Sequence, residues 1–127
     1  MTEGLEAITV ASMSKALDAA SLRQQAIASN IANANTVGYV RQEVSFENQL
    51  DDVRQEIAER GSTDLFALAS VNARLAAVTT RGGANAKVEL DMEMADMASN
   101  AMQYQTLLKA LAKNYSLLSS AANDGRK

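Results

Sequence analysis

The chain has 127 residues, of which 47% are hydrophobic but only 4% aromatic, and it contains no proline, cysteine or histidine. Its length fits one domain, and the missing residue types exclude disulfides, thiolate chemistry, imidazole catalysis and the usual zinc sites. The net charge of −3, with 12 scattered lysine and arginine residues, argues against a nucleic acid partner, because phosphate binding requires a clustered basic face.

The first residues of the chain are acidic where a secretory signal is basic, and no long apolar stretch follows them. Uninterrupted apolar runs are only a few residues long, whereas a membrane span requires about 20. We therefore expect no cleaved signal peptide and no membrane insertion. The chain is expected to be soluble, or to be exported by a route that does not read such a signal.

A long N-terminal helix is predicted over residues 8–33, because apolar residues recur at spacings of three and four and no proline interrupts them. The apolar positions of this seam are Val10, Met13, Leu17, Ala20, Ile27, Ile31 and Ala34. Gln24 is the polar exception within the series. A narrow seam of this kind is typical of a helix that packs along a second helix.

The helix is expected to end within the asparagine-rich segment 30–39. Asparagine tolerates the left-handed backbone region and glycine enters it freely, so residues 33–38 predict a helix C-terminus that passes into a turn. The simplest interpretation of this segment is a polar exit loop with no role beyond turning the chain.

The middle of the chain is predicted to hold short elements. Apolar residues alternate with polar ones over 39–46, which indicates a short strand with Val40, Val44 and Phe46 on its covered face. Many charges surround the apolar positions of residues 48–60, which suits a short exposed helix. A further helix is predicted over 65–78, and a flexible loop over 81–86.

A second long helix is predicted over residues 91–122, with Asp91 as its N-cap. Its seam comprises Leu90, Met94, Met97, Ala101, Tyr104, Leu108, Leu111, Tyr115, Leu118 and Ala122. The polar, glycine-containing segment 123–127 predicts the end of this helix. Every position of this seam is apolar or aromatic, so it is expected to match the seam of the first helix.

The predicted fold is mainly α, with long N- and C-terminal helices that pair as a coiled coil and a small middle region of a short strand, short helices and loops. Three parts are expected: residues 1–38 as the N-terminal helix with its exit turn, 39–87 as a variable, partly irregular middle region, and 88–127 as the C-terminal helix. Neither seam carries a strong pattern of flanking charges, so the register of the helix pair does not follow from the sequence.

Candidate chemistry is weak throughout the chain. Asp52 and Glu56 lie four residues apart on the predicted exposed helix and could share a hard cation, but a solvated helix face is the favoured interpretation. The glycine doublet Gly82-Gly83 lacks the rest of a phosphate-binding loop. Hydroxyl groups have no histidine to activate them. We expect no enzyme, no cofactor and no metal site.

The segment 30–39 resembles a motif shared by the axial proteins of the bacterial flagellum, which follow a long N-terminal helix with an asparagine-rich, Thr-x-Gly-aromatic exit. The preceding residues 22–25 and 28–29 also look like the rod branch. Many rod sequences carry proline where this chain has Val37, which loosens the restraint on the turn but leaves the motif recognisable.

The second resemblance lies near the C-terminus. Residues 88–94, followed by Asn100 and Tyr104, look like the C-terminal signature of the proximal branch of the flagellar basal-body rod protein family. Arginine is common in the family at the position of Gln103. The two motifs together cover about half the chain, and residues 48–86 show no recognisable match.

The resemblance implies a structural subunit of the bacterial flagellar basal-body rod that is needed for motility. Such subunits are exported unfolded by the flagellar type III apparatus without a cleaved signal, and they polymerise through their terminal helices into the periplasm-spanning rod. The implied partners are the chain itself, other rod subunits, basal-body base proteins and the flagellar export apparatus.

Two sets of residues are predicted to serve assembly. The helix-pairing set comprises Leu17, Ile27, Ile31, Met97, Tyr104, Leu108, Leu111 and Leu118. The set that fixes the exit turn comprises Asn30, Asn33, Thr36, Gly38 and Tyr39.

Alternative functions are compatible with the same pattern. The chain could be another short rod protein of the same apparatus, or a cytoplasmic helical adaptor or export chaperone that holds a client with the same seams. A small metal-dependent enzyme is a third alternative, and it would require tight binding of a divalent ion.

Overall fold

The computed structural model describes residues 2–60, 70–77 and 88–125. In chain order its elements are α1 (Thr2–Ala32), β1 (Gln42–Ser45), α2 (Glu47–Arg60), β2 (Arg74–Ala77) and α4 (Leu90–Asp124). The fold is therefore mainly α, with two long terminal helices and a small middle region, as the sequence predicts.

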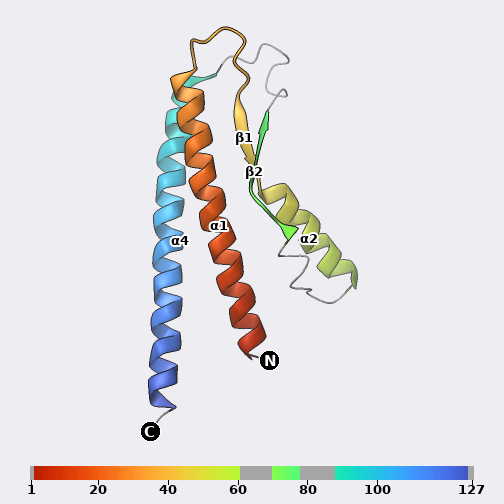
Figure 1. Ribbon diagram of the computed structural model, residues 1–127, viewed down its shortest axis with the longest axis vertical. Helices are drawn as coiled ribbons and strands as arrows, with labels where there is room; N and C mark the ends of the chain where they lie inside the picture. The colour runs from red at the N-terminus through yellow and green to blue at the C-terminus, as the bar shows by residue number, and fades with distance from the viewer. Residues whose placement is uncertain (1, 61–69, 78–87, 126–127) are drawn as a thin grey trace.

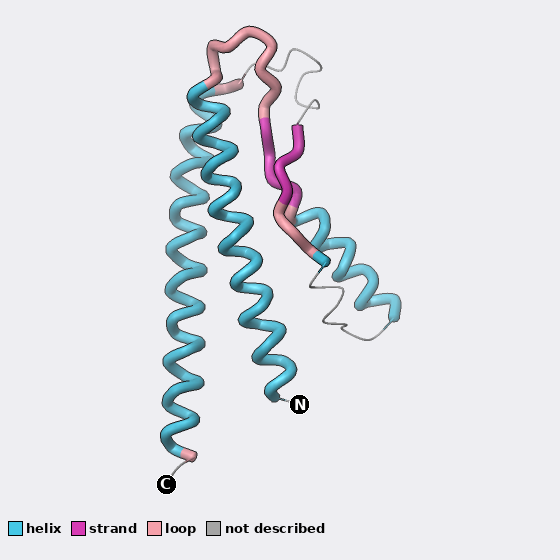
Figure 2. Tube along the Cα trace, in the orientation of Figure 1, coloured by secondary structure: helices cyan, strands magenta, loops and turns pink. Residues whose placement is uncertain are grey.

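The two long helices lie side by side and run in opposite directions, so that both chain termini lie at the same end of an elongated molecule (Figure 1). They diverge toward that end. In the view of Figure 2 the two strands and α2 lie beside α1 on the opposite side from α4, and Arg41, the residue before β1, also contacts Glu93 of α4. α1 is thus the central element, with α4 on one side and the middle region on the other.

The helix boundaries differ modestly from those predicted. α1 begins at Thr2, six residues before the predicted start, because no proline stops it and Glu6 places negative charge near the positive end of the helix dipole. α4 begins at Leu90 with Glu89 as its N-cap, so the prediction of Asp91 as N-cap is wrong. Asp91 instead lies in the first turn, where its charge still favours the helix dipole.

The predicted helix over 65–78 is wrong for residues 71–77, which are not helical and contain β2. β2 pairs antiparallel with β1, with Val44 opposite Leu75. An unpaired β1 would leave a row of backbone donors and acceptors without partners, and this pairing overrides the helical spacing of the segment. Residues 65–69 and 78, and the predicted loop over 81–86, lie outside the described residues.

The strand predicted within 39–46 is confirmed in part. Val44 and Phe46 are buried as predicted, whereas Val40 precedes the strand and is exposed. The predicted exposed helix over 48–60 is confirmed as α2, which begins one residue earlier at Glu47.

The core lies between α1 and the middle region and depends on small residues of α1. Its buried members are Ala19, Ala26, Val44, Phe46, Val53 and Val71. Alanines at Ala19 and Ala26 let the sheet and α2 approach the α1 backbone closely. The sequence predicts one seam on α1, but the helix packs on two sides, because Ala20 and Ile27, which belong to the predicted seam, are buried as well. No helix within the described ranges is long and apolar enough to cross a membrane.

Candidate assembly site at the helix exit and along α4

The side chain of Asn30 is the centre of a buried hydrogen-bond network where α1 ends. Its Nδ2 donates to the carbonyl oxygen of Gln42 at 2.9 Å, and its Oδ1 accepts from the Gln42 backbone nitrogen at 2.9 Å. Tyr39 donates its hydroxyl to the same Oδ1 at 3.0 Å, and Nδ2 also reaches Oε2 of Glu93 at 3.3 Å. One fully buried amide therefore joins α1, β1 and α4.

The exit turn is built by the other residues of the motif. Asn33 closes α1, because its Nδ2 donates to the carbonyl oxygen of Ser29 at 2.9 Å. Thr36 donates its hydroxyl to Oδ1 of Asn33 at 3.3 Å. Gly38 has a φ of +80°, a backbone conformation that costs glycine little and other residues more. The structure thus brings the five predicted turn residues together in one connected segment.

A buried ion pair extends the network to the start of α4. Glu93 is only 1% exposed and accepts a hydrogen bond from Nε of Arg41. Arg41 also pairs with Glu43 through Nη1 and approaches Asp96 at 3.7 Å through Nη2. Burial alone lowers the pKa of Arg41, but the hydrogen bonds and charges of Glu93 and Glu43 outweigh it and raise that pKa above its ordinary value.

The register of the helix pair is set by Asn100, which sequence reasoning places in the family motif but not in the helix pairing. Its Nδ2 donates to the carbonyl oxygen of Ala20 at 2.9 Å and to Oε1 of Gln24 at 2.8 Å. Gln24, the polar exception in the first seam, therefore meets a polar partner on the opposite helix. Buried amide pairs of this kind are known to fix the register of helix pairs.

The eight predicted pairing residues fall into three groups. Ile27 is buried, while Leu17, Ile31, Met97, Leu111 and Leu118 are partly buried. Tyr104 and Leu108 are exposed, at 37% and 43%. In the single chain α4 directs a polar strip that contains Glu93 and Asn100 toward α1, so part of its apolar seam faces solvent.

Eight large apolar side chains of α4 are exposed in the single chain. They are Leu90, Met92, Met94, Met102, Tyr104, Leu108, Tyr115 and Leu117. Exposed apolar surface that continues along one element is typical of a protein interface. Leu90, Met94, Tyr104, Leu108 and Tyr115 fall on one side of the helix, whereas Met92, Met102 and Leu117 lie on other sides. We call the first five residues the α4 outer face.

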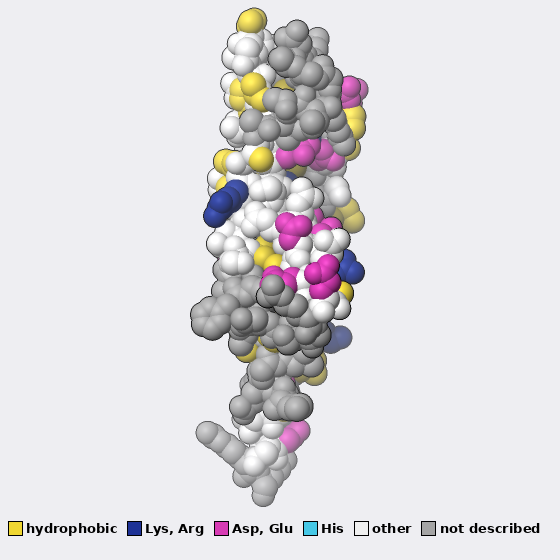
Figure 3. All heavy atoms as spheres, turned by 90° about the vertical axis from the view of Figure 1, so that its right-hand side faces the viewer, with side chains coloured by type: hydrophobic (Ala, Val, Ile, Leu, Met, Phe, Trp, Pro, Cys, Tyr) yellow, Lys and Arg dark blue, Asp and Glu magenta, His cyan; other side chains and the backbone are white. Residues whose placement is uncertain are grey.

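The carboxylates of α2 remain a solvated helix face. Asp51, Asp52, Glu56 and Glu59 are all exposed, and acidic side chains gather over α2 on the face shown in Figure 3. Asp51 contacts Arg54 at 3.4 Å. Within the ranges that the structure describes, no three acidic residues come close enough to hold a metal ion.

Comparisons with known proteins find a family match that includes the end of α1 and the exit turn. A family described as flagella basal body rod protein matches residues 12–39. The flagellar basal body rod protein FlgB of Bacillus subtilis strain 168 is 27% identical over 125 residues, which cover 93% of this chain and 95% of the relative. FlgB of Escherichia coli K12 is 30% identical over 111 residues, with coverage of 77% and 80%. FlgB of Shigella flexneri matches with the same values.

Proposed function

Because the chain belongs to the FlgB family of flagellar basal body rod proteins, we propose that it is a structural rod subunit that polymerises through its terminal helices. The observation that carries this proposal is the α4 outer face, which is apolar and exposed in the single chain. Packing against neighbouring subunits would remove this surface from water, which is the main favourable term in protein association.

The divergence of α1 and α4 toward the two termini supports the same proposal (Figure 1). Near the exit turn the helices are joined by Asn30, Glu93 and Asn100, whereas further down Leu17, Leu111 and Leu118 are only partly buried. We propose that assembly completes the helix pairing in this region. The predicted pairing residues would then be covered by α1 and α4 of adjacent subunits together.

We propose that the three parts of the chain predicted from the sequence have different roles in the rod. Residues 1–38 and 88–127 would form the rod core, and residues 39–87 would form a variable region attached to it. The attachment runs through the Asn30 and Arg41 side chains, which connect β1 to both long helices. An assembled subunit would therefore keep its middle region in a fixed orientation.

Export in an unfolded state, without a cleaved signal, is the proposed route to the rod. The chain contains no cysteine, so no covalent cross-link needs to be broken before passage through a narrow channel. A core that depends on alanine packing and polar contacts is also compatible with ready unfolding.

The proposed partners are copies of this chain, other rod subunits, basal-body base proteins and the export apparatus, in a rod that spans the periplasm. The proposal assigns no catalytic role.

The ends of the terminal helices, beyond the contacts of Asn30, Glu93 and Asn100, are proposed to be partly disordered in the free chain. Ordering the backbone costs about 1–2 kcal/mol per residue, and one thin seam does not offset this along a whole helix. A cytoplasmic adaptor or export chaperone would instead be stably helical and dimeric at low concentration. Circular dichroism of the isolated chain across concentrations separates these functions, because a rod subunit should be partly disordered when free and gain further helix when it polymerises.

The assembly role of α4 is tested by Leu108→Asp in a strain that lacks its own subunit. Because Leu108 is 43% exposed, the free chain should still fold, but a charge at this position should prevent subunit packing and abolish swimming. Ser120→Asp is the matched control, since Ser120 is exposed and lies about 120° around the helix from Leu108. Normal swimming with Leu108→Asp would contradict the proposal.

A further inference from the structure

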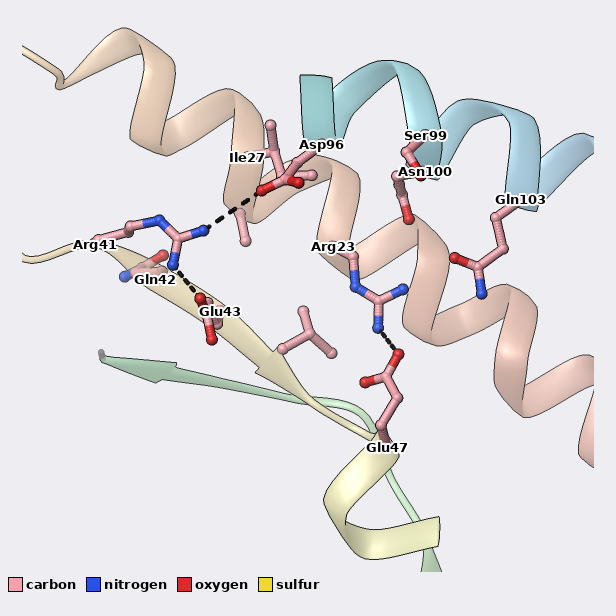
Figure 4. A pocket seen from close by; sticks show the side chains of 12 residues that line it. Arg23, Ile27, Arg41, Gln42, Glu43, Glu47, Asp96, Ser99, Asn100 and Gln103 are labelled. Carbon is pink, nitrogen blue, oxygen red and sulfur yellow. Dashed lines mark hydrogen bonds and ion pairs between the residues drawn. The ribbon is translucent and has the colours of Figure 1, made fainter. Parts of the chain in front are cut away.

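The middle region is joined to both long helices near the exit turn. Asn30 pairs with the backbone of the first residue of β1, and Arg41 pairs with the buried Glu93 of α4. Figure 4 shows Arg41 between Glu43 of β1 and Asp96 of α4. We call Asn30, Arg41 and Glu93 the exit anchor. One anchor at the end of an elongated body fixes its position but leaves it able to pivot.

Lys15 connects the middle region to α1 at a second point. It lies about four helical turns before Asn30, or roughly 22 Å along the axis of α1. Its Nζ donates to the backbone carbonyl oxygen of Val71 at 2.6 Å and to Oδ1 of Asn72 at 3.3 Å. A hydrogen bond from a charged donor contributes about 1.5–3 kcal/mol. The bond therefore links α1 to the segment that leads into β2.

Packing around this bond is incomplete. A cavity of about 250 Å³ is lined by Lys15 together with the core residues Phe46 and Val71. A second cavity, of about 310 Å³, is lined by Lys15 together with Val71 and Asn72. Lys15 therefore crosses from α1 to the middle region between two cavities, at a level where close apolar packing does not hold the two parts together.

Residues 71 and 72 are in turn bound to α2. The side-chain amide of Gln49 accepts from the Asn72 backbone nitrogen at 3.1 Å and donates to the Asn72 carbonyl oxygen at 2.9 Å. The same amide donates to the carbonyl oxygen of Ser45 at the end of β1 at 2.6 Å. Because Gln49 joins α2 to both strands, Lys15 holds the middle region as one body rather than a single loop.

The other ion pair between α1 and α2 is a weaker link. Arg23 pairs with Glu47 at the start of α2, as Figure 4 shows. The Glu47 side chain is 58% exposed, and exposed ion pairs contribute little to stability. Lys15, whose main acceptor belongs to a residue that is 2% exposed, is better placed to restrain the middle region.

We infer that Lys15 is a positioning residue that sets the angle between the middle region and the long helices. With Lys15 bound, two separated anchors fix this angle. Without the ammonium group, α2 and the strands pivot together about the exit anchor. The inference concerns the free chain and does not depend on the proposed rod function.

The test measures distances between two spin labels in the full chain by double electron–electron resonance. The labels are attached at Gln55→Cys on α2 and Ala98→Cys on α4, both exposed positions in a chain without cysteine of its own. Lys15→Met keeps the aliphatic stem and removes the ammonium group. It should increase the width of the distance distribution about twofold. Lys109→Met, at an exposed lysine of α4, is the matched control and should leave the width unchanged.

A second label pair separates a pivot from unfolding. Gln55→Cys with Arg74→Cys places both labels within the middle region, and Lys15→Met should not broaden this distribution. Broadening of both pairs would show that the middle region unfolds, and would overturn the pivot. An unchanged width for the pair between α2 and α4 would overturn the second anchor itself.

Lys15→Arg tests whether the hydrogen bond is the cause. Arginine keeps a cationic donor on a long side chain, so this variant should give the narrow distribution of the parent. A width equal to that of Lys15→Met would contradict the hydrogen bond to Val71 as the restraint.

Discussion

Asn30 and Gln42 pair through two 2.9 Å hydrogen bonds in which the asparagine amide takes the place of a neighbouring strand. Replacing Asn30 with alanine would leave the partly buried backbone donor and acceptor of Gln42 without this partner. We expect Asn30→Ala to lower the free energy of unfolding by about 2–4 kcal/mol. Urea unfolding followed by circular dichroism measures this loss. Asn35→Ala, at an exposed position two residues beyond Asn33, should change it by less than about 0.5 kcal/mol, and equal effects would contradict the role of Asn30.

Arg41→Ala should be among the most destabilising single changes, because it leaves the carboxylate of Glu93 buried without a cation. A loss of about 3 kcal/mol is expected in the same unfolding measurement. Glu43→Gln, which alters the half-exposed partner of Arg41, should cost less than about 1 kcal/mol. A small effect of Arg41→Ala would show that the buried pair is unimportant.

The raised pKa of Arg41 also determines how its contribution depends on pH. A cation whose pKa is raised by folding contributes its full stability below its ordinary pKa and loses it only as the pH rises through the folded value. Arg41 therefore remains charged up to strongly alkaline pH. The unfolding free energies of the parent and of Glu43→Gln can be compared between pH 6 and 9. Arg41 stays charged throughout this range, so its titration should not change the difference between them.

Gln24 and Asn100 are expected to be energetically coupled across the helix pair. A double-mutant cycle with Gln24→Ala and Asn100→Ala should give a coupling free energy of about 0.5–1.5 kcal/mol. The exposed neighbour Gln25 serves as the control, since Gln25→Ala combined with Asn100→Ala should be additive. Additivity in both cycles would show that the hydrogen bond between Gln24 and Asn100 does not set the register of α1 and α4.

Val71 and Leu75 test the position of the second strand. Val71 is buried in the core, whereas Leu75 is 48% exposed on β2. Val71→Ala should therefore cost about 2 kcal/mol and Leu75→Ala less than about 1 kcal/mol. The helix predicted from the sequence puts both residues on one apolar face, so similar costs for the two changes would favour that helix over β2.

The long helices could be predicted from sequence because the spacing of apolar residues and the lack of proline are local signals. The exit turn could be predicted for the same reason, since Asn33 and Gly38 favour particular backbone conformations wherever they occur. Positions such as Val44 and Phe46 followed from simple alternation.

The remaining features depend on contacts between distant residues. β2 forms because β1 supplies a partner, and nothing within residues 71–77 indicates this. Gln49 of α2 adds to the pairing, because its amide accepts from the Asn72 backbone nitrogen at 3.1 Å and donates to the Asn72 carbonyl oxygen at 2.9 Å. The rotation of α4 could not be predicted either, because Asn100 and Glu93 face α1 through bonds to residues 63 to 80 positions away. An apolar seam alone places Leu108 toward α1 instead.

The central claim, that this chain is a flagellar rod subunit, is tested most directly by locating it in isolated basal bodies. A strain without its own subunit would produce the chain with an epitope label, and basal bodies would be purified and imaged with an antibody to that label. We predict that the chain co-purifies with the basal bodies and that the label lies at the membrane-proximal end of the rod. Recovery of the chain only in the cytoplasmic fraction, with none in the basal bodies, would contradict this account.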